Sequence, residues 1–456
     1  NDGGTTSGMS ARQLEDLKKN SLAVFAEIEN TNSKIVERIQ TEPFTNYNLI
    51  VLDQALKGRS SITLTNANVT RNGAGRDANV TGLDLFLFDK TNQYGFQGKF
   101  DYSKIMGANP YNGFKSVLSL GKVSGKIQYN FLSNVESDRY DPNDLGFLGA
   151  PNKVNHQVRI SYNQLTPTDK FNSYNFSLTV RHEMLYKPFV FTNIQYNAGS
   201  FWFFKNFWDL SLNATYQPLW QKNYFELRTP GRFMRQVPWG FMRLNGSTDS
   251  RKRLFARVTL GFAESVDIKN DPYIIVHPGM RYRFSDRFSL DIDWNYMDDR
   301  GQFGYAFQRE SNGEPIIGRR RKTDVTTLIS GIYNFTSRMN VTLRARHYWS
   351  RVKYASFYNV SEDGWYIDRA FIPGQDQNFN VWNMDVFYTW DFNYGSRFII
   401  GWKNWLANDF PIDGDRNKNY WSNAGRVLFT PQGNEVTARM IFFIDSQKLK
   451  RKRNQS

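Results

Sequence analysis

The 456-residue chain contains no cysteine, which excludes structural disulfides and thiolate metal sites. Long apolar runs are also missing. A membrane-spanning helix needs about 18 consecutive apolar residues, whereas residues 440–444 and 189–191 are among the longest apolar stretches of this chain. These absences exclude a helical membrane protein. The chain also lacks an initiator methionine and a signal peptide, so we interpret its start as a product of processing or as part of a longer protein.

The formal charge of +15 raises the question of nucleic-acid binding, because an excess of Lys and Arg is the electrostatic signature of phosphate recognition. The basic residues, however, are spread through the whole chain, and only residues 448–453 form a dense basic tail. We therefore expect no nucleic-acid partner. Attraction to anionic lipid headgroups or anionic solutes explains the charge better.

Aromatic residues are abundant, while continuous apolar segments are few. Hydrophobic residues make up 40% of the chain and aromatic residues 16%, with 37 Phe, 24 Tyr and 12 Trp. This balance favours a protein with aromatic girdles at two membrane interfaces and a hydrated interior. An aromatic-rich soluble β-sandwich or propeller is the alternative.

Residues 281–296 have the clearest pattern in the sequence, that of a β-hairpin with a tight turn at residues 285–287. Side chains alternate between the two faces of a strand. The predicted lipid-facing residues of the second strand are Leu290, Ile292, Trp294 and Tyr296. The opposite, polar face of the hairpin carries Arg281, Arg283, Asp291 and Asp293.

The same alternation recurs from residue 44 to residue 445, and it is cleanest at Tyr174, Phe176, Leu178 and Val180, which we also predict to face lipid. We therefore predict an all-β fold, a transmembrane antiparallel up-and-down β-barrel of about 18 strands, within a range of about 16–20. The domain prediction is a tether and amphipathic helix at residues 1–43, the barrel at 44–445 and a basic tail at 446–456.

Loop lengths predict the orientation of this barrel. Short turns such as residues 285–287 alternate with long polar connections, which we place at residues 134–152, 217–236, 299–323, 352–378 and 406–433. In bacterial outer-membrane barrels the short turns face the periplasm and the long loops face outward. The predicted location is therefore the cell outer membrane of a Gram-negative envelope.

An amphipathic helix is predicted to precede the barrel. Ser10 suits a helix N-cap, and Leu14, Leu17, Leu22, Phe25 and Ile28 follow at roughly helical spacing. The helix extends toward Ile35 and Ile39 and ends before Pro43 in this prediction. It either occludes the barrel or lies at its periplasmic mouth, or it is a linker from an upstream domain.

Two segments link the chain to a known family: Asp141-Pro142-Asn143-Asp144-Leu145-Gly146-Phe147-Leu148, and residues 58–68 with Gly58-Arg59-Ser60-Ser61-Ile62. With these loop and turn motifs, residues 44–445 resemble uncharacterised outer-membrane barrels of Bacteroidota-type bacteria, described as a domain of unknown function. In that family the barrel commonly follows a module similar to family-9 carbohydrate-binding domains. The resemblance implies the fold and assigns no activity.

The sequence shows no catalytic constellation. A barrel hydrolase needs a nucleophile, a histidine and a third partner at one rim, and the four histidines lie on separate predicted strands. Asp291 and Asp293 are better explained as counter-charges for nearby arginines. We therefore expect neither an enzyme nor a bound cofactor or metal.

A pore or transporter is the leading functional prediction, with an Arg-rich lumen that the N-terminal helix or the loops could occlude. The lumen-lining candidates are Arg159, Arg181, Arg257, Arg281, Arg283, Asp291, Asp293, Arg344, Arg346 and Arg439. Rings of arginine would favour anions. A ladder of internal salt bridges, with no net selectivity, is the alternative explanation.

A non-conducting scaffold of an envelope complex is the second functional prediction. Aromatic loops at residues 357–372 and 402–410 could dock other envelope proteins, as could the N-terminal segment. Residues 301–309 and 314–322 could form an extracellular hairpin whose Arg319-Arg320-Arg321 tip contacts lipopolysaccharide phosphates. The predicted partners are therefore outer-membrane lipid, lipopolysaccharide and other envelope proteins.

Overall fold

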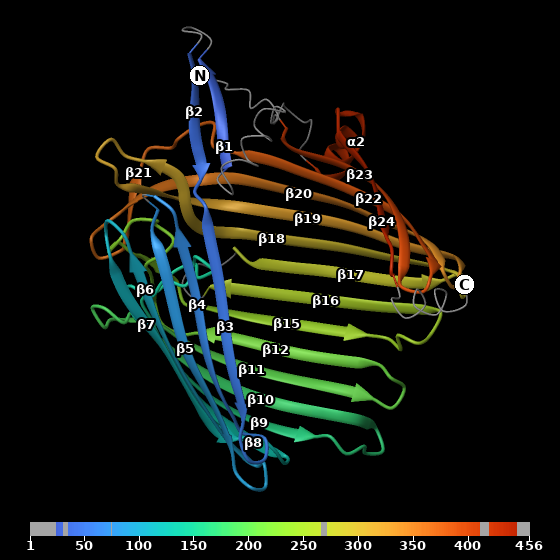
Figure 1. Ribbon diagram of the computed structural model, residues 1–456, viewed down its shortest axis with the longest axis horizontal. Helices are drawn as coiled ribbons and strands as arrows, with labels where there is room; N and C mark the ends of the chain where they lie inside the picture. Colours follow the sequence, from blue (N-terminus) through green and yellow to red (C-terminus); the bar gives the residue numbers. More distant parts are fainter. Residues whose placement is uncertain (1–23, 31–34, 74, 266–270, 411–418, 445–456) are drawn as a thin grey trace, which may run out of the picture. The chain divides into compact units, whose positions relative to one another are not determined.

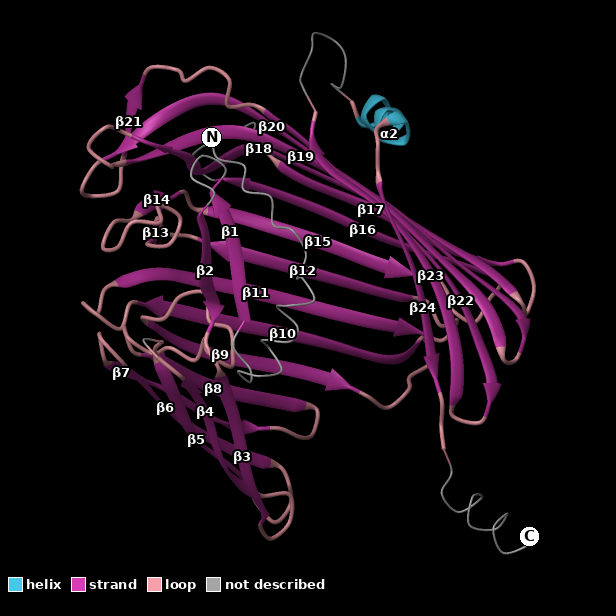
Figure 2. Ribbon diagram, turned by 45° about the horizontal axis from the view of Figure 1, so that its top comes forward, coloured by secondary structure: helices cyan, strands magenta, loops and turns pink. Residues whose placement is uncertain are grey.

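The computed structural model describes residues 24–30, 35–73, 75–265, 271–410 and 419–444. The protein is all-β and contains a large antiparallel sheet, and strands make up most of the described chain (Figures 1 and 2). The chain divides into two compact units. Unit 1 comprises Asn1–Tyr162 and Thr179–Ile194, and unit 2 comprises Asn163–Leu178 and Gln195–Ser456.

Unit 1 contains a run of antiparallel hairpins joined by short connections (Figure 1). Each strand pairs with the next one along the chain from β3 to β9. Its strands are β1 (Val24–Asn30), β2 (Ile35–Glu42), β3 (Thr45–Ala55), β4 (Ser61–Arg71), β5 (Asp77–Phe88), β6 (Tyr94–Met106), β7 (Tyr111–Lys122), β8 (Ile127–Glu136) and β9 (Lys153–Gln164).

Unit 2 also consists mainly of antiparallel strands, several of which are longer than those of unit 1. Strands β9, β10 and β11 contribute residues to both units. Its elements are β10 (Phe171–Met184), β11 (Phe191–Phe204), β12 (Asp209–Gln217), β13 (Gln221–Asn223), β14 (Met234–Gln236), β15 (Trp239–Ser247), β16 (Leu254–Ser265), β17 (Tyr273–Arg283), β18 (Phe288–Arg309), β19 (Pro315–Thr336), β20 (Met339–Val360), β21 (Tyr366–Arg369), β22 (Gln377–Asn393), β23 (Ser396–Asp409), α2 (Tyr420–Phe429) and β24 (Gly433–Ile441).

The register of the ladders gives each unit one apolar and one polar face, because directly paired residues lie on the same side of a sheet. In unit 1, Leu83 pairs with both Leu64 and Phe100. In unit 2, Ile292 pairs with both Met280 and Ile329. We call the faces that carry these residues the apolar faces and the opposite ones the polar faces.

The predicted N-terminal helix is wrong where the structure describes it. Residues 24–30 and 35–42 form the antiparallel hairpin β1–β2, in which Asn30 pairs with Ile35 and Phe25 with Gln40. β-branched residues at 24, 28, 35, 36 and 39 favour extended backbone, and the Asn-rich stretch at residues 30–32 is a turn signal. The remainder of the predicted helix, residues 10–23, lies outside the described residues.

Two of the predicted long loops contain more regular structure than expected. Residues 299–323 are mostly the paired outer parts of β18 and β19, each 22 residues long, which join at the tip over residues 310–314. Residues 406–433 include α2, whose N-cap Asn419 accepts a hydrogen bond from the Ser422 backbone N–H. In the described residues, no helix has the length and apolar character needed to span a membrane.

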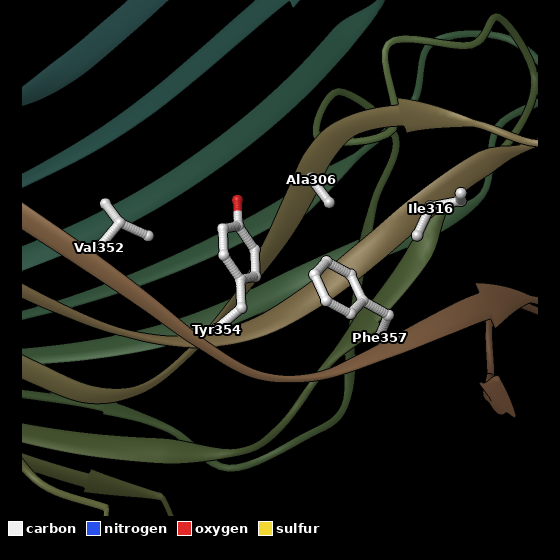
Figure 3. Packing of buried hydrophobic residues seen from close by; sticks show 5 residues of the cluster. All are labelled: Ala306, Ile316, Val352, Tyr354 and Phe357. Carbon is white, nitrogen blue, oxygen red and sulfur yellow. The ribbon is translucent and has the colours of Figure 1, made fainter. Parts of the chain in front are cut away.

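The outer parts of β18, β19 and β20 have a small hydrophobic core of their own. Tyr354 and Phe357 stack with their ring centroids 4.9 Å apart, and Ala306, Ile316 and Val352 complete the cluster (Figure 3). All five side chains are buried. Burial of apolar area explains why these strands extend beyond the rest of the sheet as an ordered structure.

The loop at residues 137–152 folds back onto the polar face of unit 1. The Tyr140 hydroxyl lies 3.2 Å from an Asp101 carboxylate oxygen, and the Asp141 backbone N–H donates to the Ser103 hydroxyl at 3.1 Å. Gly113 on β7 allows this approach. A Cβ atom there would lie 2.2 Å from the Tyr140 backbone nitrogen, so only glycine fits.

We predict that Gly113→Ala destabilises unit 1, because the new methyl group would overlap the backbone of residues 139 and 140. The expected loss is about 2–3 kcal/mol of unfolding free energy, the upper part of the range for overpacking. Urea titration followed by tyrosine fluorescence and far-UV circular dichroism measures the loss, because unit 1 contains no tryptophan. Trypsin cleavage at Arg139 reports detachment of the loop.

Gly149→Ala is the matched control, since Gly149 lies in the same loop and no heavy atom lies within 4 Å of the added Cβ position. Its effect should stay within about 0.5 kcal/mol. Equal stability and equal cleavage of the two variants would contradict the packing of the loop against β7.

Candidate functional site

The polar face of unit 2 holds a compact charge cluster. The Arg257 guanidinium contacts both Asp291 and Asp293, with Nε 3.0 Å from Asp293 Oδ1 and one Nη 3.2 Å from Asp291 Oδ2. His277 Nε2 lies 3.4 Å from Asp293 Oδ1. The three side chains of the Arg–Asp–Asp cluster are each less than a third exposed, at 29%, 27% and 19%. One arginine therefore bridges two carboxylates that would otherwise repel each other, and it offsets one of their two negative charges.

Gly279 makes this contact possible. Arg257 on β16 pairs with Gly279 on β17, and Gly279 pairs in turn with Asp293 on β18. The arginine has to reach across the middle strand. A Cβ atom at Gly279 would lie 2.2 Å from Asp293 Oδ1 and 2.7 Å from Arg257 Nε, so glycine leaves the gap in which the two side chains meet.

Arg281 and Arg283 also lie on the polar face, and they bind the backbone of the connection that joins β15 to β16. Arg281 donates to the Ser250 carbonyl oxygen at 2.8 Å, and Arg283 donates to the Arg251 carbonyl at 3.1 Å. A carbonyl oxygen satisfies the donors of a guanidinium without cancelling its charge. These two arginines therefore keep a positive potential at the short-turn end of the face.

The remaining lumen candidates lie on other strands of the two units. In unit 2, Arg346 donates to Asn383 Oδ1 at 3.0 Å, Arg344 pairs with Asp385 in the ladder, and Arg439 is exposed on β24. In unit 1, Arg181 donates to Gln157 at 3.3 Å and Arg159 is exposed. Direct contact unites only Arg257, Asp291 and Asp293 among the predicted residues.

A chamber at the outer end of the polar face of unit 2 was not predicted from the sequence. It has a volume of about 570 Å³, and β13, β14 and the outer parts of β18 and β19 contribute to its wall. Its charged lining residues are Glu226, Glu264, Asp271, Asp299 and Arg320. Acidic residues outnumber basic ones here, in contrast to the short-turn end. The Gln and Glu residues between positions 217 and 236, several of which line the chamber, were the feature of the sequence that could have indicated it.

The arginine triplet does not form a hairpin tip. Arg319, Arg320 and Arg321 lie within β19, several residues before the tip at residues 310–314, and each has its own partner. Arg319 forms an ion pair with Asp271, Arg320 donates to Gln302 at 2.7 Å, and Arg321 binds Asp298 at 2.7 Å. Alternation along a strand sends neighbouring side chains to opposite faces, so three consecutive arginines cannot act as one patch.

The predicted lipid-facing residues share one face on each strand. On β10, Phe176 and Leu178 are 42% and 51% exposed, and Tyr174 and Val180 alternate with them in the same strand. Phe176 packs edge-on against Trp202 with centroids 5.8 Å apart.

On β18, Ile292 pairs with Ile329 and Leu290 with Gly331. Trp294 and Tyr296 stack at 5.8 Å. These residues form the apolar face of unit 2, and no described segment covers the exposed part of it around Leu254, Leu260 and Phe262, which are 52%, 42% and 50% exposed.

The Asp-Pro-Asn-Asp motif pins the 137–152 loop to the connection between β4 and β5. Asp144 accepts from Arg71 at 2.7 Å and from Arg76 at 2.9 Å, and Arg76 also reaches Asp141 at 3.2 Å. Burial by itself would raise the pKa of Asp141, but hydrogen bonds from Tyr111 and from the Asn143 backbone, with the charge of Arg76, lower it overall. The motif therefore has a structural role in unit 1, where its ion pairs hold the 137–152 loop against Arg71 and Arg76.

The four histidines lie on four different strands, β9, β10, β17 and β20. His156 and His182 stack at 6.5 Å on the apolar face of unit 1, beside Phe131, whereas His347 is buried and hydrogen-bonded to Asn380. Within the described ranges, no group of three His, Asp or Glu side chains is placed to hold a metal ion.

The family described as Domain of unknown function (DUF5916) matches residues 19–453. The chain matches none of the curated proteins with which it was compared.

We predict that Arg257→Gln costs about 2 kcal/mol of unfolding free energy, because it leaves two carboxylates side by side without their shared cation. This value lies between those of exposed and fully buried ion pairs, as the partial exposure of the cluster requires. Urea titration measures it. Arg346→Gln is the matched control and should cost less than about 1 kcal/mol, since its partner Asn383 is neutral.

A double-mutant cycle identifies the cause of the loss. In a background carrying Asp291→Asn and Asp293→Asn, the cost of Arg257→Gln should fall to about 0.5 kcal/mol or less. An unchanged cost in that background would show that packing, not charge, explains the effect.

Proposed function

Because the chain belongs to the DUF5916 family, which is defined by a domain of unknown function, we propose its role from the geometry: an outer-membrane β-barrel whose polar face lines a hydrated passage for small water-soluble solutes. In this proposal the apolar faces meet lipid. The short connections face the periplasm and the long ones face outward, as in other outer-membrane barrels.

The uncovered apolar face is the observation that carries the proposal. In unit 1, Leu83, Leu118, Leu120 and Ile160 are between 43% and 52% exposed, and they lie on the apolar face of β5, β7 and β9. Soluble proteins rarely expose contiguous apolar surface larger than a few hundred Å². A sheet whose large hydrophobic side chains are uncovered on one face, while Asn, Ser, Thr and charged residues occupy the other, fits lipid on one side and water on the other.

Closure of the sheet into a barrel is part of this proposal. The barrel would consist of nineteen strands, β3–β12, β15–β20 and β22–β24. This number lies within the range of about 16–20 strands predicted from the sequence. In its own unit, each of the terminal strands β3 and β24 runs toward the short connections. They would therefore pair in parallel, a departure from the even, fully antiparallel barrels that bacteria usually build.

The charges on the polar face favour weak rather than strong selectivity. Arg257 is neutralised by Asp291 and Asp293, which supports the salt-bridge ladder over a ring of unpaired arginines. Arg281 and Arg283 bind carbonyl oxygens and keep their charge. The outer chamber is acidic. A solute would thus pass an acidic entrance and a basic exit, and the proposed passage has a modest preference for anions at its periplasmic end.

A scaffold role is the second candidate, because some aromatic loop side chains are exposed. Phe147 is 93%, Phe371 56% and Trp365 44% exposed. Phe357, which was predicted to lie in a docking loop, belongs instead to the hydrophobic core of the outer strands. In this role the exposed aromatic residues would dock other envelope proteins. We further propose that the chain comes from a Bacteroidota-type bacterium and that a carbohydrate-binding-like module is one of its neighbours.

Single-channel recording in planar bilayers separates the two roles. The pore proposal predicts discrete conductance steps from the purified full chain, because an open sheet or a sealed scaffold cannot support an ion current. We expect Arg281→Gln with Arg283→Gln to lower the anion-to-cation permeability ratio by about twofold or more, as measured by the reversal potential in a salt gradient.

Lys57→Gln with Lys126→Gln is the control for that pair, since it removes two cations from short connections outside the paired strands. Its permeability ratio should match that of the parent chain. Silent bilayers containing correctly inserted protein would reject the pore and favour the scaffold. If the parent chain, the arginine variant and the lysine control all conduct with the same anion-to-cation permeability ratio, Arg281 and Arg283 do not set the anion preference.

A further inference from the structure

A second cavity lies on the apolar side of unit 2, away from the polar face. It has a volume of about 540 Å³, and β18, β19, β20 and the first turn of α2 form its walls. The lining includes Trp294, Tyr296, Trp349 and Trp421 as aromatic side chains and Arg321, Arg351 and Lys353 as cations. Aromatic and cationic groups thus share a pocket that opens on the side proposed to meet lipid.

Ladder register arranges these groups in order of polarity. Tyr296, Val325 and Trp349 form one cross-strand row on the apolar face. The next row outward on that face is Asp298, Thr323 and Arg351, and Arg321 then pairs with Lys353. The side chains therefore change from aromatic to charged within two rows. This change marks the level at which hydrocarbon would give way to headgroups in the proposed barrel.

A buried polar cluster holds α2 against this part of the sheet. Asn423 Oδ1 accepts hydrogen bonds from Asn378 and Asn380, each at 3.0 Å. The Tyr420 hydroxyl donates to Thr327 Oγ1 at 2.6 Å. All three asparagines are at most 1% exposed, so the contact is fully desolvated. The helix is therefore a fixed wall of the cavity.

The other side of α2 is apolar and exposed. Trp421, Leu428 and Phe429 are 77%, 64% and 90% exposed. A short helix that buries polar amides against the protein and presents aromatic residues outward has the polarity expected at a lipid interface rather than in water. Large aromatic side chains beside the cavity would contact the acyl chains of a molecule bound there.

The charge balance of the cavity favours an anion. Asp298 is fully buried and accepts from Arg321 at 2.7 Å, from Arg300 at 3.0 Å and from Thr323 at 3.0 Å. Arg351 and Lys353 line the same cavity together with Arg321, so the charged residues among its described lining are all cations. Guanidinium and ammonium groups close together are the usual recognition elements for phosphate.

We propose that this cavity binds the phosphorylated headgroup of an outer-leaflet lipid, with Arg351 and Lys353 on the phosphate and Trp421 beside the acyl chains. The inference rests on the proposed membrane location. It assigns the lipid to the α2 cavity and not to the hairpin tip, because Arg321 belongs to the cavity whereas Arg319 and Arg320 bind other partners. The bound lipid would be an annular ligand at a fixed position on the barrel.

The test measures binding of bis-phosphorylated lipid A to the full chain in detergent, by native mass spectrometry and by quenching of tryptophan fluorescence. We expect Arg351→Gln with Lys353→Gln to weaken binding by about tenfold to a hundredfold, the loss of one or two charge-assisted hydrogen bonds. Trp421→Ala should also weaken binding. Because the Trp421 side chain is exposed, we do not expect this substitution to disturb folding, so weaker binding would report a lost contact with the lipid.

Arg338→Gln with Lys403→Gln is the matched control, because it removes two cations from the same unit outside the cavity. It should bind lipid A as the parent does. Dephosphorylated lipid A should bind at least about tenfold more weakly than the bis-phosphorylated form. Inorganic phosphate at equal concentration should not displace the lipid.

Equal affinity of the cavity variant and the control, or binding of inorganic phosphate as tight as that of the lipid, would overturn the proposal. These results differ from failure of the pore. A chain that inserts into bilayers and conducts, yet binds all the lipids alike, refutes only the lipid site. A chain that does not insert into lipid vesicles at all refutes the membrane location and the lipid site together.

Discussion

Pairing of backbone N–H and C=O groups between neighbouring strands is the constraint on which the rest of this structure depends. Each strand satisfies its backbone only by lying beside its neighbours in a defined register. That register then fixes which side chains meet on each face. It brings Leu64, Leu83 and Phe100 together on one side of unit 1, and it places Arg257 across from Asp293 in unit 2.

The same constraint explains why one residue type has several roles. Arg257 bridges two carboxylates, Arg283 binds the backbone of a turn, and Arg321 lines the cavity beside α2. None of these roles follows from the local sequence around each arginine. They follow from the face on which the strand presents the side chain and from its distance along the strand. Gly279 on β17 has no side chain, and this leaves room for Arg257 on β16 to reach Asp293 on β18.

Much of the fold could be predicted from period-two alternation, because apolar and polar residues separate cleanly on strands such as β10 and β18. The turn at residues 285–287 is also explicit in the sequence. The β1–β2 hairpin was wrongly predicted as a helix because Phe25, Ile28, Ile35 and Ile39 fit helical spacing, although the β-branched residues among them also favour a strand. Short apolar segments carry both periodicities, and pairing with a neighbour decides between them.

The candidate site was harder to predict, because charge partners and cavities depend on register between strands far apart in the chain. Asp291 and Asp293 were correctly interpreted as counter-charges for arginine, but the sequence does not identify Arg257 as the specific partner. Residues of β18 and β19 line the outer chamber, and residues of β18, β19 and β20 line the α2 cavity. The outer parts of these strands have the polar composition of loops, so the sequence did not predict that they continue as strands. Asn378, Asn380 and Asn423 look like ordinary loop asparagines until α2 docks on the sheet.

The central claim is that the apolar face meets hydrocarbon and the polar face meets water. Single cysteines placed in turn at residues 174–178 of this cysteine-free chain test it most directly, after reconstitution into vesicles with brominated acyl chains. The account predicts that a fluorophore at 174, 176 and 178 is quenched by the lipid, whereas cysteines at 175 and 177 react with a membrane-impermeant maleimide. Consecutive positions that behave alike, or even-numbered positions shielded from the acyl chains, would contradict it.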